Sequence, residues 1–241
     1  MAYDEGLFDL KGKKIVIKLG TKVVFDSGLG KIRRDVIMGL ARDVAELVRR
    51  GCEIVIVSSG AVGCGSDIIK GNGGLGVKQA RAAVGQIKLM NEYSEAFVEF
   101  DLDVAQFLLN KDDLNSKRLE NIKTAYGNIG SGIIPIINEN DVTTTDELTF
   151  GDNDGLAVEI LESFDFDVLL VLTDVGVLIS GGESVLRSDK FEISDYDSFE
   201  VDALGSGGLE SKLDAARRAV EGGKVFVVGK AGDSVVDILE R

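Results

Sequence analysis

Asparagine and aspartate side chains gather in two clusters that are separated by one short segment. The first cluster, Asn138–Asp141, follows an apolar run, and the second, Asp152–Asp154, begins a stretch with helical periodicity. Their oxygen atoms suit Mg²⁺ or an ammonium group, and their amide N–H groups suit a carboxylate. Asparagine and aspartate also cap helices and form turns. Because both clusters flank the same short segment, the sequence predicts a functional site here.

Two lysines lie next to glycines, in positions that suit the binding of an anion. Lys18 ends an apolar run and is followed by Gly20, and Lys212 follows the loop Gly205–Gly208 in the first turn of a predicted helix. A lysine, free backbone N–H groups and a helix N-terminus together can bind phosphate. A surface lysine beside an ordinary turn also explains Lys18, and an exposed hinge also explains the loop.

Two further apolar runs end in small or polar residues. One leads into Ser58–Gly63, whose small side chains leave backbone N–H groups accessible to a carboxylate or a phosphate. A tight turn without a ligand fits the same residues. The other run ends at Thr173 and Asp174, a polar pair where a nucleotide could be held.

Composition excludes several classes of chemistry. The 241 residues include no histidine and two cysteines, so the commonest general base is absent and neither a zinc site nor a disulfide framework is expected. No Gly-Lys-Ser/Thr phosphate-binding motif occurs. The net charge of −14 disfavours general nucleic-acid binding. The first residues lack a signal-peptide pattern and no apolar run reaches the roughly 18 residues of a membrane span, so we expect a cytoplasmic protein.

The elements that must position these residues alternate between short apolar runs and stretches of helical periodicity. This alternation indicates parallel βαβ units in an open α/β sheet, whose ligands bind beyond the carboxyl ends of the strands. The candidate strands are Lys14–Lys18, Glu53–Ser58, Val104–Leu109, Ile133–Ile137, Val168–Thr173 and Lys224–Val228. Core-facing helical stripes are predicted at Val36, Leu40, Val44 and Leu47, at Ala83, Ile87, Met90 and Phe97, and at Leu209, Leu213, Ala216 and Val220.

The order of the motifs resembles that of the amino-acid kinase family. The matching segments are KLGT, SSGAVG, KQARAAVGQIKLM, AQFLL, IPIINENDVT, FGDND, LLVLTDV and GSGGLESKLDAA, which run in family order from Lys14 to about Gly229. KLGT or LTD alone would be a weak signal. AAVGQ, INEND and GDND in this order are typical of the branch that phosphorylates the side-chain carboxylate of glutamate.

The resemblance implies an α/β fold, a three-layer αβα sandwich with a mainly parallel central sheet. It implies a single amino-acid kinase domain over residues 1–241, with an acceptor lobe in 1–165 and a nucleotide lobe in 166–241. The expected reaction transfers phosphate from ATP, with Mg²⁺, to L-glutamate, as the first step of proline biosynthesis. Feedback inhibition by proline and a homo-oligomer are further expectations. We expect a kinase domain alone, without the PUA domain that many bacterial members carry.

Carried over residue by residue, the resemblance implies catalytic roles for Lys18 and Lys212 at the phosphates and for Asp154, which would orient both lysines. The residues expected to bind glutamate are Ser59, Gly60, Asp141 and Asn153. The residues expected at the nucleotide are Lys18, Gly20, Thr173, Asp174, Ser206, Gly207, Gly208, Leu209, Glu210, Ser211 and Lys212. A carboxylate acceptor is already ionised at neutral pH and needs no general base, which agrees with a chain that lacks histidine.

One segment departs from the family pattern, and two other functions stay open. The family continues after LTDV with Asp-Gly-Leu-Tyr and a proline-containing stretch, whereas this chain has Gly176–Gly182, which leaves the nucleotide preference open.

A kinase of the same fold could act on aspartate, acetylglutamate, UMP or a small phosphate monoester. A phosphorylated acceptor should need more cations near Ser58–Gly63 than Lys70, Lys78 and Arg81. A non-catalytic ligand sensor is the second alternative, and the retained lysines and aspartate argue against it.

Overall fold

Seven strands form one sheet in the computed structural model of the chain, which describes residues 9–71, 73–114, 117–145, 153–174, 186–188 and 209–240. The strands lie in the order β5-β6-β4-β1-β7-β9-β8. Their bounds are β1 Lys14–Leu19, β4 Glu53–Ser58, β5 Asp103–Leu109, β6 Ile133–Glu139, β7 Val168–Thr173, β8 Leu186–Ser188 and β9 Val225–Lys230. All neighbours pair in parallel except β8, which runs antiparallel to β9. The six strands predicted from the sequence are confirmed.

The central strand β1 shows how the sheet separates two cores. Ile15, Ile17 and Leu19 are fully buried in the core on one face, whereas Val16 is fully buried in the core on the other. Successive side chains of a strand point to opposite faces, so a continuous apolar run suits a strand that is covered on both sides. The apolar runs in the sequence therefore placed these strands in the middle layer.

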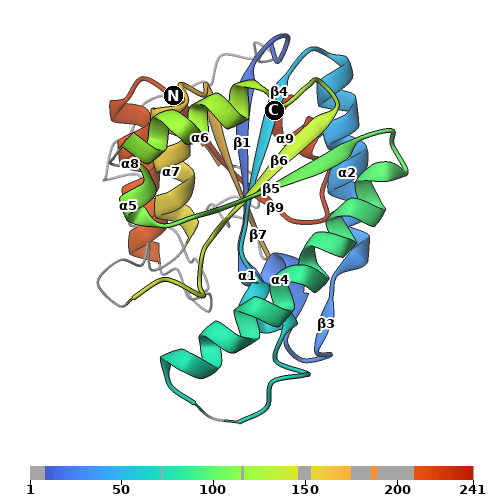
Figure 1. Ribbon diagram of the computed structural model, residues 1–241. Helices are drawn as coiled ribbons and strands as arrows, with labels where there is room; N and C mark the ends of the chain where they lie inside the picture. Colours follow the sequence, from blue (N-terminus) through green and yellow to red (C-terminus); the bar gives the residue numbers. More distant parts are fainter. Residues whose placement is uncertain are drawn as a thin grey trace.

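Helices form the two outer layers (Figure 1). The layer on one face contains α2 (Arg34–Arg49), α4 (Leu75–Val98) and α9 (Val235–Glu240). The layer on the other face contains α5 (Lys111–Leu114), α6 (Lys117–Gly127), α7 (Asn153–Ser163) and α8 (Leu209–Glu221). The predicted three-layer αβα sandwich with a mainly parallel sheet is confirmed.

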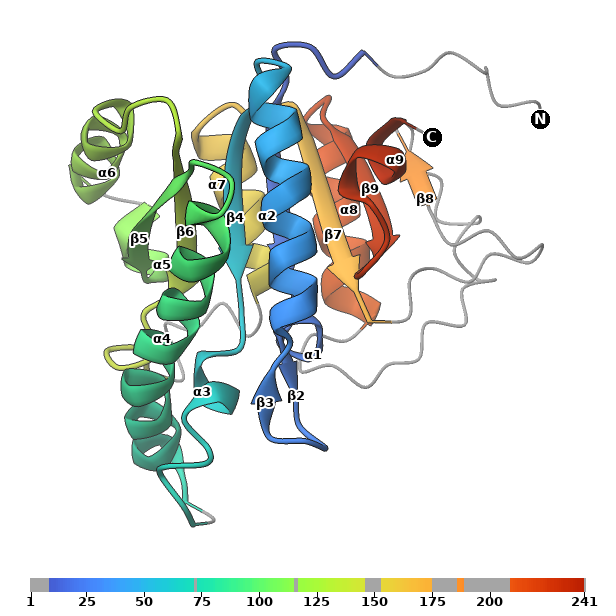
Figure 2. The same ribbon diagram turned by 90° about the vertical axis from the view of Figure 1, so that its right-hand side faces the viewer.

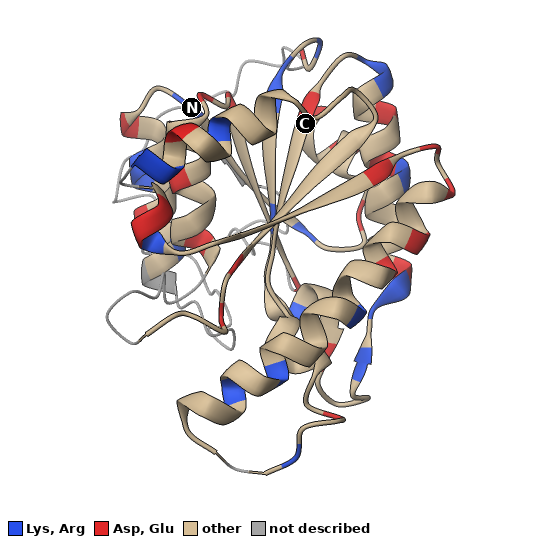
Figure 3. Ribbon diagram, in the orientation of Figure 1, with Lys and Arg blue, Asp and Glu red and all other residues tan. Residues whose placement is uncertain are grey.

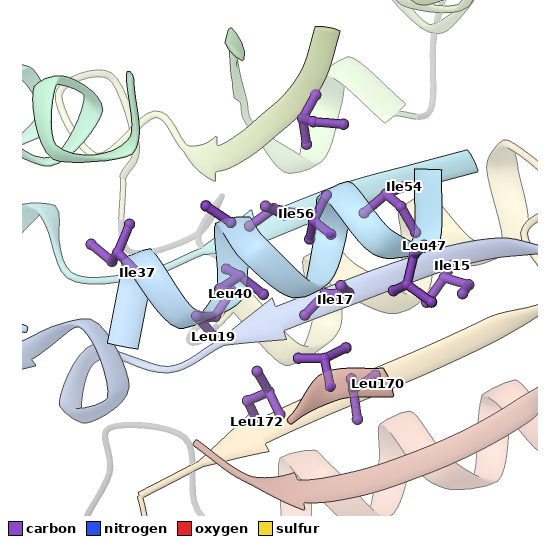
Figure 4. Packing of buried hydrophobic residues seen from close by; sticks show 14 of the residues in the cluster. Ile15, Ile17, Leu19, Ile37, Leu40, Leu47, Ile54, Ile56, Leu170 and Leu172 are labelled. Atoms are coloured by element: carbon purple, nitrogen blue, oxygen red, sulfur yellow. The ribbon is translucent and has the colours of Figure 1, made fainter. Parts of the chain in front are cut away.

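The helix α2 packs as its sequence predicts. Leu40, Val44 and Leu47 are buried, and the half-buried Val36 packs against the same core. Figure 4 shows Leu40 and Leu47 between the helix and the side chains of β1 and β4. Burying one such side chain contributes about 1.5–3 kcal/mol.

The helix α8 packs on the other face of the sheet, as the third stripe predicts. Ala216 is buried in the core there and Val220 packs against it, whereas the side chain of Leu209 lies outside the described part.

The stripe predicted for α4 is wrong at two of its four positions. Ala83 is exposed and the Ile87 side chain is 66% exposed, although Met90 packs against the core and Phe97 is fully buried in it. The buried side of the helix instead carries Ala82, Gly85, Gln86, Leu89, Tyr93, Ala96 and Phe97. In this stripe Gly85 packs against the backbone of Ala61, and Gln86 is hydrogen-bonded to Asn138 near the carboxyl end of β6.

Several short elements extend beyond the carboxyl ends of the strands (Figure 2). They are α1 (Thr21–Val24), the antiparallel pair β2 (Phe25–Asp26) and β3 (Lys31–Ile32), and α3 (Ala61–Cys64), next to the beginning of α4. In an open parallel sheet this edge is where ligands bind.

Lys, Arg, Asp and Glu are spread over the helices, and the strands carry few of them (Figure 3). Among the described helices, none has both the length and the apolar character needed to cross a bilayer.

The sheet continues across the predicted boundary between residues 165 and 166. β1 pairs with β4 on one side and with β7 on the other, over residues from Ile15↔Val168 to Leu19↔Leu172 in the second pair. The two predicted lobes therefore share one sheet, and their assignment to acceptor and nucleotide stays a prediction.

Candidate active site

Three elements bring charged side chains together at the carboxyl edge of the sheet. Lys18 is the penultimate residue of β1, Asp154 lies in the first turn of α7, and Lys212 lies in the first turn of α8. The helices α7 and α8 pack side by side on the same face of the sheet. The three residues predicted to be catalytic are far apart in sequence, and the fold brings both lysines into contact with Asp154.

Asp154 lies between the two lysines. Its Oδ1 forms an ion pair with the Lys18 ammonium group, and its Oδ2 lies 3.1 Å from Lys212 Nζ. The hydroxyl of Ser211 also donates to Oδ2, at 3.2 Å. The Asp154 side chain is fully buried and that of Lys18 is 4% exposed, whereas that of Lys212 is 20% exposed. Lys212 is thus the cation of this cluster that reaches solvent most readily.

The charge on Asp154 is maintained against burial. Burial acts to raise the pKa of this carboxyl group, but the nearby ammonium groups of Lys18 and Lys212 outweigh it and hold the pKa below its usual value. Asp154 is therefore an anion at neutral pH. An isolated buried charge would be costly, and pairing with two cations offsets that cost.

Asn153, next to Asp154, is fixed by two hydrogen bonds from its side-chain amide. Asn153 Nδ2 donates to the backbone oxygen of Ser58 and to Asn138 Oδ1, each at 2.8 Å. These bonds tie the start of α7 to the ends of β4 and β6. The side chain of Asn153 is buried, as is that of Asn138.

The strand β6 is longer than predicted, and the extension changes the surroundings of the first Asn/Asp cluster. The predicted strand ended at Ile137, but Asn138 and Glu139 continue to pair with Leu108 and Leu109 of β5. Both side chains are consequently buried at the end of a strand, and only Asn140 and Asp141 follow it. Asn138 faces the site interior because strand geometry, rather than a turn, sets its direction.

The turn after β4 depends on a glycine. Gly60 has φ +108°, and a Cβ added there would lie 2.4 Å from Val24 Cγ2, so both the backbone and the space favour glycine. The backbone N–H of Ser59 donates to Leu19 O at 2.9 Å, which links the ends of β4 and β1. Ser59 and Gly60 therefore lie beside the strand that carries Lys18.

A close helix contact positions this turn. A Cβ added to Gly85 of α4 would lie 1.9 Å from the backbone oxygen of Ala61, the first residue of α3. Only glycine permits such an approach of two backbones. The contact explains why a glycine stands in the AAVGQ segment of α4.

Asp141 lies two residues beyond β6, on the rim of a hollow of about 490 Å³. The hollow is bordered by α4 at Gln86 and Ile87, by β5 at Gln106 and Leu108, and by Glu139–Val142. Burial raises the pKa of Asp141 to about 6, and the nearby Glu139 carboxylate contributes to the rise. This carboxyl group thus changes its charge close to physiological pH.

Thr173 and Asp174, two of the residues predicted to bind the nucleotide, lie on the side of β1 away from β4. Thr173 ends β7, and its Oγ1 is buried without a hydrogen-bond partner in the described part of the chain. Asp174 follows and is half-buried. Gly20 precedes α1 as its N-cap, and a Cβ there would lie 3.9 Å from Lys18 Nζ. A buried hydroxyl with an open hydrogen-bonding capacity suits a polar ligand.

Part of the predicted site lies outside the described residues. Ser206, Gly207 and Gly208 belong to this part, as do Asp152 and the departing segment Gly176–Gly182. Leu209 and Glu210 begin α8, but their side chains are not described. Of the predicted loop and helix start, Ser211 and Lys212 can be placed, and both contact Asp154.

Sequence reasoning missed Gln86 and Tyr93, two residues of α4 that are hydrogen-bonded to the ends of β6 and β4. Gln86 Oε1 accepts a hydrogen bond from Asn138 Nδ2 at 2.8 Å, and Ser58 Oγ and Tyr93 OH lie 2.9 Å apart. The phase of the apolar residues in α4 pointed to Ile87, so Gln86 was not considered. A signal was present in the AAVGQ segment, where an amide stands among small residues of a core helix.

Two ammonium groups that converge on one buried carboxylate, at the carboxyl edge of a parallel sheet, define an α/β protein equipped to bind an anion. A model of the amino acid kinase family matches residues 13–229, and the chain belongs to this family.

Curated relatives add a narrower similarity. The chain is 38% identical over 236 residues to a glutamate 5-kinase of Geobacter sp. (strain M21), which covers 90% of this chain and 62% of the relative. It is 36% identical over 240 residues to a glutamate 5-kinase of Dictyoglomus turgidum (strain DSM 6724 / Z-1310), covering 95% of this chain and 64% of the relative. The chain therefore spans less than two thirds of the length of these relatives.

Two solved structures share the fold. Carbamate kinase from Giardia superposes with a TM-score of 0.59 at 16% identity, covering 95% of this chain and 96% of the other. N-acetylglutamate synthase from Neisseria gonorrhoeae superposes with a TM-score of 0.62 at 13% identity, covering 94% of this chain and 56% of the other. At these identities the similarity concerns the fold alone.

Proposed function

We propose that the chain transfers the γ-phosphoryl group of ATP to the side-chain carboxylate of L-glutamate. The observation that carries the proposal is the buried Asp154 carboxylate, which holds the ammonium groups of Lys18 and Lys212 at the carboxyl edge of the sheet. The relatives named glutamate 5-kinase support glutamate as the acceptor.

This reaction needs no side chain that moves a proton. A carboxylate oxygen of glutamate forms a bond to the γ-phosphorus, the bond from that phosphorus to the bridging oxygen of ATP breaks, and its electron pair leaves with ADP. Because the nucleophile is already an anion at neutral pH, a general base is unnecessary. Catalysis then depends on positioning and on stabilising the charge of the transferred group. Lys18 and Lys212 would supply that stabilisation, with Asp154 holding them together against their mutual repulsion.

The nucleotide would bind on the side of β7. We assign Gly20, Thr173 and Asp174 to it, together with Ser206, Gly207, Gly208, Leu209, Glu210, Ser211 and Lys212. The buried Thr173 hydroxyl supports this assignment. Mg²⁺ would come with ATP and neutralise part of the phosphate charge. In the described ranges, no three or more Cys, Asp or Glu side chains are grouped to hold a metal ion, so the phosphates would be its principal ligands.

Glutamate would bind on the side of β4 and β6. The Ser59 hydroxyl and the Gly60 backbone would face one of its carboxylates, beside the end of β1. Asn153 and Asp141 would face its ammonium group, because both offer oxygen acceptors. The carboxylate of Asp141 would be ionised above about pH 6.

A variant of Lys212 tests the proposal. With glutamate, ATP and Mg²⁺, the protein is expected to form an acyl phosphate that hydroxylamine traps as a hydroxamate. Lys212→Ala is expected to abolish this product, while calorimetric titration shows nearly unchanged glutamate binding. Lys224→Ala serves as the control, because Lys224 pairs with the exposed Asp165 before β9 begins. Turnover of aspartate, acetylglutamate or UMP without any hydroxamate from glutamate would contradict the proposed acceptor.

Further properties of the whole protein are part of the same proposal. We expect a homo-oligomer in the cytoplasm, with proline competing for the glutamate site. Residues 1–165 would carry the acceptor and residues 166–241 the nucleotide, although both lie on one sheet.

A further inference from the structure

We propose that Gln86 is a positioning residue that orients the amide groups of the glutamate site, an inference that rests on the proposed function. Gln86 lies on the buried side of α4 and is 9% exposed. Its Oε1 accepts a hydrogen bond from Asn138 Nδ2 at 2.8 Å. It is joined through Asn138 to Asn153, which lies next to Asp154.

Gln86, Asn138 and Asn153 are linked by successive hydrogen bonds, and the orientation of each amide determines that of the next. Asn138 Oδ1 accepts from Asn153 Nδ2 and from the backbone N–H of Glu139, each at 2.8 Å. If the Asn138 amide turned over, its NH₂ group would face these two donors and both hydrogen bonds would be lost. The Gln86 oxygen favours the observed orientation, because it offers an acceptor on the side where the NH₂ group lies.

The consequence for Asn153 is chemical. Its NH₂ group carries two hydrogens, and they are used by Ser58 O and by Asn138 Oδ1. Only its Oδ1 is then left to contact a ligand, and an amide oxygen accepts hydrogen bonds. The free Oδ1 of Asn153 is therefore oriented to accept a hydrogen bond from a donor, such as the ammonium group of an amino acid. Gln86 maintains this orientation through Asn138.

The buried position of Gln86 restricts its side chain to the observed hydrogen bond with Asn138. An amide is costly to bury unless it is hydrogen-bonded, so a glutamine in the core of α4 needs a partner. Its neighbour Gly85 packs against the backbone of Ala61. The backbone of α4 is therefore held close to the site at the residue before Gln86, which leaves the Gln86 side chain little freedom to follow a displaced Asn138.

Three variants separate the hydrogen bond from other effects. Gln86→Met keeps the size of the side chain and removes the acceptor. Gln86→Glu restores an oxygen acceptor at the same place. Gln106→Met makes the same exchange at an exposed residue of β5 that borders the same hollow.

Steady-state kinetics give the first measurement. Gln86→Met is expected to raise the KM for L-glutamate about five- to tenfold, in the range of one lost hydrogen bond, with kcat and the KM for ATP within twofold of the wild type. Gln86→Glu is expected to recover most of the loss, and Gln106→Met to show none. An unchanged KM for glutamate in Gln86→Met would overturn the proposal. So would an equal rise of both KM values, or a Gln86→Glu variant as impaired as Gln86→Met.

A second measurement does not depend on catalysis. In protein labelled with ¹⁵N-asparagine, hydrogen exchange of the Asn138 and Asn153 side-chain amides reports their hydrogen bonds directly. Gln86→Met is expected to accelerate this exchange about tenfold, whereas Gln106→Met leaves it unchanged, with circular dichroism confirming that each variant folds. Unchanged exchange in Gln86→Met would overturn the proposal even if the enzyme is active. Accelerated exchange in a protein that does not phosphorylate glutamate would support the network and contradict only the proposed function.

Discussion

Removing the charge of Asp154 should destabilise the protein strongly. Asp154→Asn keeps the shape of the side chain but leaves the Lys18 ammonium, whose side chain is 4% exposed, facing a neutral amide and a second cation. Breaking a buried ion pair in this way costs about 3–5 kcal/mol. For a domain of this size, each kcal/mol lowers Tm by about 2–4 °C, so a decrease of roughly 6–20 °C is expected.

The control is the same exchange at an exposed pair. Asp165 forms an ion pair with Lys224, but its side chain is 89% exposed, so Asp165→Asn should change the free energy of unfolding far less than Asp154→Asn does. Asp165 has φ 53°, which asparagine tolerates well, so backbone strain should not complicate the comparison.

Urea unfolding followed by circular dichroism measures both variants, since the chain contains no tryptophan for fluorescence. The pKa of Asp154 is lowered in the folded protein, so its contribution is fully present above about pH 4 and is lost on further acidification. The difference between wild type and Asp154→Asn should therefore narrow below about pH 4. A loss of stability at pH 7 no larger than that of Asp165→Asn would refute the claim that this carboxylate neutralises the buried Lys18.

Two further predictions concern the acceptor side. Because burial first and Glu139 second raise the pKa of Asp141 to about 6, the KM for glutamate should fall about tenfold per pH unit up to that value and then level off. Initial rates between pH 5 and 8 measure this, and the same profile in Asp141→Asn would count against the role of Asp141. Gly85→Ala would place a Cβ 1.9 Å from Ala61 O and should cost about 1–3 kcal/mol or more in urea unfolding. Gly76→Ala, in the same helix with open space around it, should instead stabilise by up to about 1 kcal/mol, and equal effects of both changes would contradict the close-packing argument.

The central strands were predictable because they are buried on both faces, whereas the edge strand β5 is partly exposed. An apolar run such as Val168–Thr173 that lies between helical stretches is most simply explained as a buried strand, and the structure confirms this strand. The convergence of Lys18, Asp154 and Lys212 was not predictable from spacing. It follows from the fold. The residue types had marked each of the three as a candidate, but only the resemblance to a known family grouped them in one site in advance.

The phase of α4 could not be derived from hydrophobicity. Ile87 is more apolar than Gln86, yet Gln86 faces the interior because Asn138 supplies a hydrogen-bond partner, and Ile87 is left 66% exposed. A partner on a distant strand is invisible to a rule that counts apolar residues along one helix. The same limit explains why the strand was predicted to end at Ile137, although pairing with Leu108 keeps Asn138 in β6.

The place of β1 in the middle of the sheet has a consequence for synthesis of the protein. β1 can pair with β4 early, but its other edge stays open until β7 is available, since Ile15 pairs with Val168. The roughly 150 residues between them take on the order of 8–30 s to emerge at ~5–20 residues per second. During that interval an apolar strand carries an unpaired edge and Lys18 has no buried partner. The ribosome-bound chain should therefore be most prone to mispairing and most dependent on chaperones just before β7 emerges.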